Sequence, residues 1–256
     1  MRIGVYIDGY NLYYGGKRLF ASNSGSWKWF SPRGIAESAL HNQQQFAAGH
    51  GWGQMVQDWS HAYISRVVYC TARVNGSQNP SAQADQDVYL KALVAAGAVD
   101  HIEYGNYVAR VKVAPLAVTS PTSTPTLVQS NWPVMVKDAV GNEIRNANFF
   151  VSYLHNEEKG SDVNVAAHLL IDTLDKQIDG AIVISNDSDL KLPIAQARDR
   201  IPVGVVNPGS KYTSGDLQPA HAVGQGPHWN RRLRPADFTS NQLSDPSGIY
   251  PKPAGW

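Results

Sequence analysis

The sequence predicts an α/β fold of three layers, with helices on both faces of a central, mainly parallel β-sheet. Short apolar runs alternate along the chain with longer segments of helical spacing, and this alternation is typical of parallel sheets. Two runs, Met1–Ile7 and Ala181–Ile184, are almost wholly apolar, as expected for strands buried on both faces. The chain has 256 residues, of which 43% are hydrophobic, which is enough for one large domain with an extension.

The elements of the first hundred residues follow from apolar spacing and turn residues. The strand Met1–Ile7 ends at the turn-rich tetrad Asp8–Asn11, and we expect a helix over Leu12–Leu19. Further on, the pattern predicts a loop at 21–34, a polar helix at 34–48, a strand within Ser60–Cys70, a loop at 76–80 and a helix at Ser81–Ala96.

A Thr-, Ser- and Pro-rich run at Pro115–Pro133 cannot form a packed helix. Predicted strands flank it, at Val99–Tyr104 and Tyr107–Val113 before the run and at Val134–Lys137 and Asn148–Leu154 after it. We therefore expect residues 104–154 to form an inserted β-hairpin excursion from the α/β core.

The strongest helical pattern covers Ser161–Leu174, with Ser161 as the expected N-cap. A strand at Ala181–Ile184, a helix at Leu190–Arg200 and a last strand at Val203–Val206 complete the expected domain, residues 1–212. Residues 213–256 are rich in Pro, Gly, His and Ser, and we expect them to pack on this domain as a C-terminal arm.

Charge and composition restrict the possible partners. The formal net charge is +1, which excludes a protein held to nucleic acid by overall charge alone. Cys70 is the single cysteine, so no internal disulfide forms. No apolar stretch reaches the ~20 residues of a membrane span, and the start of the chain lacks a basic-then-apolar leader. These features predict a cytoplasmic protein without a membrane partner.

Acidic residues follow two of the apolar strands. Asp8 comes directly after the first strand, and Asp187 follows Ile184 by three residues. Because ligands of parallel α/β sheets bind beyond the carboxyl ends of the strands, we expect these carboxylates to face one crevice. Asp162, in the first turn of the Ser161–Leu174 helix, can point into the same crevice, and Asp189 is a possible fourth member.

A cluster of carboxylates is tolerated when a cation neutralises it, because like charges raise one another's pKa. Oxygen ligands around a small cavity suit Mg²⁺ or Mn²⁺, which keep several waters and leave coordination positions for phosphate oxygens. Such an ion polarises a phosphodiester, activates a bound water and steadies the leaving oxygen. The acidic residues therefore favour phosphodiester hydrolysis.

Each acid also has a purely structural interpretation. Asp8 fits a turn before Gly9, Asp162 complements a helix dipole, and both Asp187 and Asp189 fit as N-caps of the following helix. The functional interpretation depends on their coincidence at strand ends.

The polar neighbours have two interpretations as well. Asn11 suits either a contact to phosphate or metal-bound water, or a helix cap. Ser185 suits either a hydrogen bond to the acids or an ordinary strand end, and Lys159 either a phosphate contact or a solvated charge. We expect His168 and Asp172 to be structural, because His168 lies on a different helix face from Asp162.

Three motifs resemble those of the NYN domain family of the PIN-like nuclease superfamily, including bacterial NYN domain-containing proteins. They are Val5–Asn11, with its Asp-x-x-Asn; Glu158–Asn164, with Lys-x-x-Asp-Val opening a helix; and Ile184–Leu190, where Ser-Asn-Asp-Ser-Asp is similar to Ser-Gly-Asp-Ser-Asp. They occur in the family's order, and the resemblance covers roughly residues 1–212. Asn186 departs from a frequent Gly, and His168 stands where some relatives have Asp.

The resemblance implies a PIN-like, Rossmannoid fold and a metal-dependent ribonuclease that hydrolyses RNA with Mg²⁺ or Mn²⁺. It makes Asp8, Asp162 and Asp187 the metal ligands, with Asp189 and Asn11 completing the catalytic set. We further expect substrate contacts from Lys159, Ser185 and Asn186.

Two other functions stay open from the sequence. One is a non-catalytic RNA-binding or adaptor module with a PIN-like fold. The other is a different phosphoryl-transfer enzyme, which the absence of an Asp-x-Asp-x-Thr motif after the first strand and of a Gly-Lys-Ser/Thr loop disfavours. The sequence leaves open whether the chain forms a homo-oligomer. Further RNA contacts are conceivable from basic and aromatic side chains: Lys17, Arg18, Lys211, Arg231, Arg232, Arg234, Trp27, Trp29 and Trp229.

Overall fold

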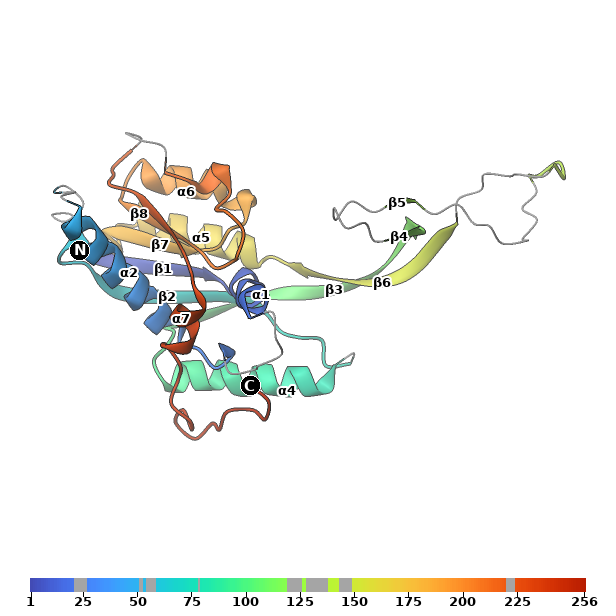
Figure 1. The fold of residues 1–256 in the computed structure, drawn as a ribbon, viewed down its shortest axis with the longest axis horizontal. Coiled ribbons are helices and arrows are strands. Elements are labelled where there is room, and N and C mark those ends of the chain that lie inside the picture. Colours follow the sequence, from blue (N-terminus) through green and yellow to red (C-terminus); the bar gives the residue numbers. More distant parts are fainter. Residues whose placement is uncertain are drawn as a thin grey trace. The chain divides into compact units, whose positions relative to one another are not determined.

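A seven-stranded sheet is the centre of the fold (Figure 1). The computed structural model describes residues 1–20, 27–50, 53, 59–77, 79–118, 126–127, 138–142, 149–219 and 224–256. The strands are, in spatial order, β6 (Phe150–Lys159), β3 (His101–Pro115), β2 (Tyr63–Ala72), β1 (Arg2–Asp8), β7 (Gly180–Ile184), β8 (Val203–Asn207) and β9 (Trp229–Arg232). Every pair from β3 to β9 is parallel. The mainly parallel α/β fold predicted from the sequence is thereby confirmed.

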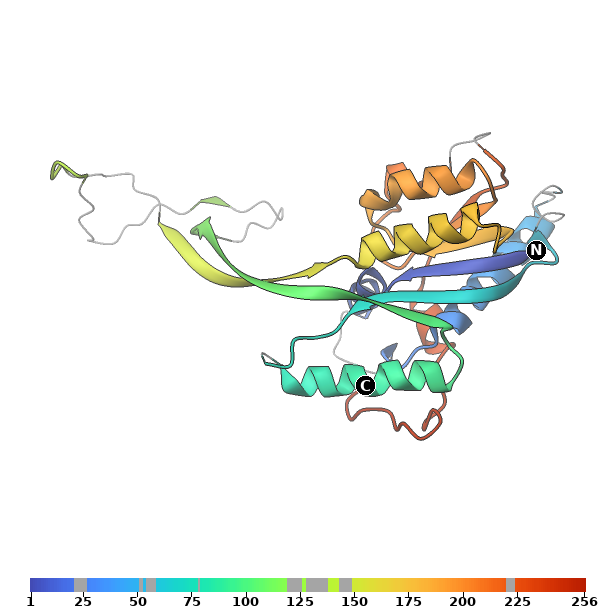
Figure 2. The same ribbon diagram turned by 180° about the vertical axis from the view of Figure 1, so that it is seen from behind.

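Helices cover both faces of this sheet, as Figure 2 shows from behind. One face carries α1 (Gly9–Leu19), α2 (Pro32–Gly49), α4 (Pro80–Ala95) and α7 (Pro235–Thr239), whereas α5 (Ser161–Leu174) and α6 (Lys191–Arg198) pack on the other. Two apolar clusters form as a result. Val5 and Ile7 of β1 belong to one cluster and Tyr6 to the other, because successive strand residues point to opposite faces.

The chain forms two compact units by its internal contacts. One unit is Met1–Tyr107 with Glu158–Trp256, and the other is Val108–Glu157. The second unit contains the outer part of the predicted excursion, including a short antiparallel pair of β4 (Ala117–Val118) and β5 (Thr126–Leu127). The strand expected at 134–137 lies outside the described residues.

Three local expectations were wrong. The two strands expected at 99–104 and 107–113 are one continuous strand, β3, since Gly105 does not interrupt it. Gly160, with φ of 93°, is the N-cap of α5 in place of Ser161, which is buried as the first helical residue. The residues after 212 are more than an arm, because β9 extends the sheet beside β8.

Among the described helices, none is both long and apolar enough to cross a membrane.

The most deeply buried polar contact of the α5 face joins that helix to the sheet. Asp172 is 3% exposed and accepts a hydrogen bond of 2.7 Å from the Tyr6 hydroxyl. It also forms an ion pair with Arg66 at 2.8 Å. The carboxylate of Asp172, expected to be structural, therefore fixes α5 on β1 and β2.

Tyr6→Phe should lower the free energy of unfolding by about 1–3 kcal/mol, because it leaves a buried carboxylate oxygen without its donor. Tyr63→Phe, at a tyrosine that is 57% exposed, is the matched control and should change stability little. Urea denaturation of both variants makes the comparison. Equal effects of the two substitutions would contradict the assigned role of the Tyr6 hydroxyl.

Candidate active site at the carboxyl ends of β1 and β7

Asp8 is the last residue of β1 and is only 4% exposed. Its Oδ1 accepts a hydrogen bond of 2.9 Å from the Asn11 backbone N–H, so Asp8 is the N-cap of α1. Its Oδ2 accepts a hydrogen bond of 3.1 Å from the Ser185 hydroxyl. Each carboxylate oxygen therefore keeps one further lone pair for another partner.

Gly9 allows this approach of α1 to the sheet. A Cβ at this position would lie 2.7 Å from the Tyr69 ring and 2.9 Å from the Cys70 carbonyl oxygen. Any larger residue would push α1 away from β2, and the Asp8 carboxylate would move with it.

The loop after β7 is tied to the start of α1. The Asn186 N–H donates to Asn11 Oδ1 at 3.1 Å, and the Asp187 N–H donates to Ser185 Oγ at 3.1 Å. Asp187 also caps the short 3-10 helix η2 (Ser188–Leu190) through a bond of 3.0 Å from the Asp189 N–H, a capping role that the sequence predicted. Asp8, which the sequence suggested as a turn residue, caps α1, and Asp8 and Asp187 belong to one hydrogen-bonded assembly.

Negative charge accumulates around Asp8. Burial raises the pKa of Asp8 to about 6, while the hydrogen bonds from Asn11 and Ser185 oppose the rise. The carboxylates of Glu158 and Asp187 raise this pKa further by repulsion. This repulsion between like charges gives a cation an electrostatic reason to bind here.

Glu158 is the site residue that the sequence did not single out. Glu158 lies near the end of β6, just before α5, and its Oε1 accepts a hydrogen bond of 3.2 Å from the Ser161 N–H. Its charge also raises the pKa of Cys70, Tyr10 and Tyr107. The available signal was its position at the end of a strand, which is the same signal that identified Asp8.

The other predicted residues have varied positions. Asp162 lies in the first turn of α5, partly buried, with no hydrogen bond or ion pair to Asp8 or Asp187 among the described contacts. The Asn186 side chain is used structurally: it donates to the Tyr212 carbonyl oxygen at 3.3 Å and accepts from the Ser214 N–H at 2.8 Å. Lys159 follows Glu158 at the end of β6. The metal and substrate roles of these residues stay predictions.

Tyrosines of α1 form one side of the site. The rings of Tyr10 and Tyr14 lie 4.5 Å apart between centroids, and Tyr13 packs edge-on to Tyr14 at 5.3 Å. Tyr10 is 40% exposed, and Tyr107 is close enough to these rings for their charges to affect its pKa. The aromatic rings therefore gather beside the acids, a grouping that composition alone did not locate.

Several side chains considered for RNA contact have other functions. Trp27, Trp29 and Trp229 are 1–3% exposed and belong to the core, so they are not available for stacking on bases. Arg231 pairs with Asp237 at 2.5 Å. Lys17 lies over the Tyr14 ring at 5.7 Å, next to the tyrosine group.

A second polar cluster lies on the α5 face. His101 and His168 both place Nε2 near Glu103 Oε2, at 2.9 and 3.2 Å. These hydrogen bonds lower the pKa of Glu103. In the described part of the chain, this is the one set of three His, Cys, Asp or Glu residues whose candidate ligand atoms all lie within 4.8 Å of one another. Asp8, Asp162 and Asp187 are spaced more widely.

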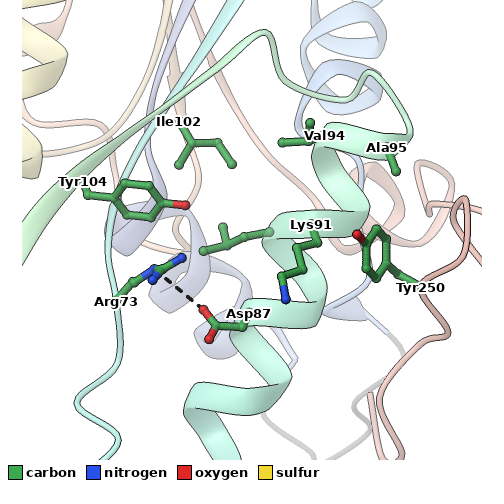
Figure 3. Close-up of a pocket in the computed structure, with 9 residues that line it drawn as sticks. Arg73, Asp87, Lys91, Val94, Ala95, Ile102, Tyr104 and Tyr250 are labelled. Carbon is green, nitrogen blue, oxygen red and sulfur yellow. Dashed lines mark ion pairs between the residues drawn. The ribbon is translucent and has the colours of Figure 1, made fainter.

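A pocket of about 290 Å³ lies on the opposite face, between α4 and β3 (Figure 3). Arg73 pairs with Asp87 in it at 3.7 Å and stacks on the Tyr104 ring at 5.1 Å. The pocket is lined by Arg73, Asp87, Leu90, Lys91, Val94, Ala95, Ile102, Tyr104 and Tyr250. It contains none of the predicted site residues, so it is separate from the acidic assembly.

No family model matches the chain. The chain is 26% identical over 241 residues to 6-hydroxy-3-succinoylpyridine 3-monooxygenase HspA of Pseudomonas putida, an alignment that covers 90% of this chain and 66% of that protein. The chain thus spans just under two thirds of this relative, which by its name is an enzyme.

Among solved structures, the chain is similar to VPA0982, a protein of unknown function from Vibrio parahaemolyticus. The two are 14% identical, with a TM-score of 0.43 and coverage of 93% of this chain and 94% of the other.

The donor set at Asp8 fits a hard divalent cation. Mg²⁺ is held in proteins through one or two carboxylates and keeps several water ligands. Acids that do not all contact the ion directly can therefore belong to the same site. Asp8 has a free lone pair on each oxygen, and the charges of Glu158 and Asp187 act on the same point. Asp8, Asp187 and Glu158 are the residues that would hold the ion.

Asp8→Asn should stabilise the metal-free protein at pH 8 by about 2–3 kcal/mol, because a pKa of about 6 against about 3.9 in the unfolded chain makes ionised Asp8 unfavourable. Between these two pKa values, Asp8 binds a proton in the folded state but not in the unfolded state. The free energy of unfolding of the wild type therefore falls as the pH rises from about 4 to about 6. Asn preserves the cap of α1. The gain should therefore nearly vanish at pH 4.

Urea denaturation in EDTA at both pH values measures this difference. Asp175→Asn, at an exposed acid at the far end of α5, is the matched control. A loss of stability in Asp8→Asn at pH 8 would show that the carboxylate charge is compensated in the folded protein.

Proposed function

We propose that the chain is a divalent-metal-dependent nuclease that hydrolyses RNA phosphodiester bonds at the carboxyl ends of β1 and β7. The observation that carries the proposal is the buried Asp8 carboxylate, with the charges of Glu158 and Asp187 acting on it. A site with this excess of negative charge favours a cation, and the cation favours an anionic substrate.

The resemblance to NYN domains adds the class of substrate. The three motifs of that family contain Asp8, Asp162 and Asp187, and two of these acids lie within the hydrogen-bonded assembly described above. Mg²⁺ or Mn²⁺ bound there would polarise a phosphate and lower the pKa of a water molecule.

The residues of the chain have separate roles in this proposal. Asp8, Asp187 and Glu158 hold the ion, and Asp162, in the first turn of α5, is the further acid that the family motifs assign to it. Ser185 and Asn11 orient the acids by their hydrogen bonds to Asp8 and to the Asn186 backbone, so they are positioning residues. Asp189, whose N–H donates to Asp187, supports that carboxylate.

The tyrosines suit an unpaired strand. Tyr10 and Tyr14 place two tilted aromatic rings near Asp8, and base stacking on an aromatic ring stabilises binding by about 1–3 kcal/mol per base without strong sequence preference. Lys17, over the Tyr14 ring, places a positive charge at the same surface for the phosphate backbone. Single-stranded RNA is therefore the favoured substrate.

Two alternatives to a metal-dependent ribonuclease predict different experimental results. A non-catalytic RNA-binding module would retain RNA without cleaving it. A second enzymatic candidate is hydroxylation of an aromatic ring, because the curated relative is named a monooxygenase. It would be detected as reductant-dependent oxygen consumption with a hydroxypyridine.

We expect the pure protein to cleave labelled single-stranded RNA with Mg²⁺ or Mn²⁺ and not with EDTA. Asp8→Asn and Asp187→Asn should each lower the rate at least about 100-fold, equivalent to about 2.7 kcal/mol of barrier. Glu158→Gln should reduce the rate and raise the metal concentration required. Asp175→Asn is again the matched control.

Cleavage that persists in Asp8→Asn or in EDTA would refute the proposed mechanism. RNA binding without cleavage in the wild type would favour the adaptor module.

A further inference from the structure

The His101–Glu103–His168 cluster is built from two elements that pack face to face. His101 and Glu103 are two residues apart on β3, so both point to the same side of the sheet. Their β2 partners in register, Val68 and Cys70, belong to the apolar cluster on the α5 side. His168 comes from the middle of α5 and meets them from above the sheet.

The spacing of the ligand atoms suits a small metal ion. Bonds of about 2.0–2.1 Å to nitrogen and oxygen place neighbouring ligands about 2.9 Å apart in octahedral and about 3.3 Å apart in tetrahedral geometry. The Nε2 atoms of His101 and His168 lie 2.9 and 3.2 Å from Glu103 Oε2, and all three atoms lie within 4.8 Å of one another. The ligands are thus already close to the separations that coordination requires.

We propose that His101, Glu103 and His168 bind a first-row divalent transition metal, with Zn²⁺ as the representative ion. Imidazole nitrogens favour Zn²⁺ and its neighbours, whereas Mg²⁺ favours oxygen ligands alone. The site therefore differs in chemistry from the acidic assembly at Asp8, and it does not depend on the nuclease proposal.

The site is open to solvent on one side. The side chains of His101, Glu103 and His168 are 43%, 39% and 20% exposed. Three protein ligands with solvent access leave a coordination position for water, as catalytic zinc sites do and closed structural sites do not. The ion therefore can bind an exogenous ligand as well as join β3 to α5.

Register places this site near the acids without merging the two. Glu103 is paired with Cys70, and Cys70 is paired with Asp8 across neighbouring strands. Two strand spacings separate the Asp8 and Glu103 backbones by about 10 Å. Asp8 does not belong to the set of ligand atoms that lie within 4.8 Å of one another, so we expect two ions of different chemistry to be held separately.

Metal binding of the full chain tests the proposal, with Zn²⁺ followed by calorimetry and Co²⁺ followed by visible absorption. With excess Mg²⁺ present to occupy the acidic site, we expect one equivalent of each ion to bind to the wild type. His168→Asn and Glu103→Gln should each weaken the affinity at least about 10-fold and remove the Co²⁺ bands. Both substituted side chains are partly exposed, and circular dichroism verifies that the variants fold.

Two controls separate this site from other histidines and from the acids. His41→Asn replaces an exposed histidine of α2, and Asp8→Asn removes the central acid; both should bind Zn²⁺ as the wild type does. Unchanged affinity in both His168→Asn and Glu103→Gln, or loss of the Zn²⁺ in Asp8→Asn, would overturn the proposal.

Discussion

The burial of Asp8 at the carboxyl end of β1 is the constraint on which the site depends. Its two oxygens hold the first turn of α1 and the Ser185 hydroxyl, and Ser185 in turn holds the Asp187 backbone. Asn11 completes the link by accepting from Asn186. The start of α1 and the loop after β7 are therefore fixed by one carboxylate, which the low dielectric of its surroundings makes unfavourable to ionise. Retaining an acid there, where an uncharged Asn would still accept the cap bond of α1, has a physical reason if a cation binds.

The chain separates two kinds of ligand on one face of its sheet. Oxygen donors gather at the strand ends around Asp8, whereas the imidazoles of His101 and His168 share a single carboxylate on β3, two strands away across the sheet. Hard and intermediate cations select between such donor sets by ligand type and geometry. The tyrosines of α1 lie on the side of the oxygen site, where the proposed function has them stack on an unpaired base.

The sequence predicted much of this arrangement and missed identifiable parts. Asp8 and Asp187 were predicted to lie together because parallel strands end at one edge of the sheet. Glu158 was missed because Glu157-Glu158-Lys159 resembles a run of solvent-exposed charges. Its position also depends on where the chain, after the inserted β-hairpin excursion, returns to lie beside β3. The histidine cluster was missed because it joins residues 65 positions apart, and no local pattern records such a contact. Trp27, Trp29 and Trp229 could not be assigned to core or surface from composition, and β9 has only one apolar side chain, Trp229, to mark it as a strand.

The central claim is that a divalent cation binds beside Asp8. Crystals soaked in Mn²⁺ and measured near the manganese absorption edge test it most directly, because anomalous scattering locates the ion independently of any activity. The account predicts an anomalous peak in contact with the Asp8 carboxylate, at about 2.0–2.2 Å, with Asp187 or Glu158 bound directly or through water. An anomalous map without a peak beside Asp8 at saturating Mn²⁺ would contradict it.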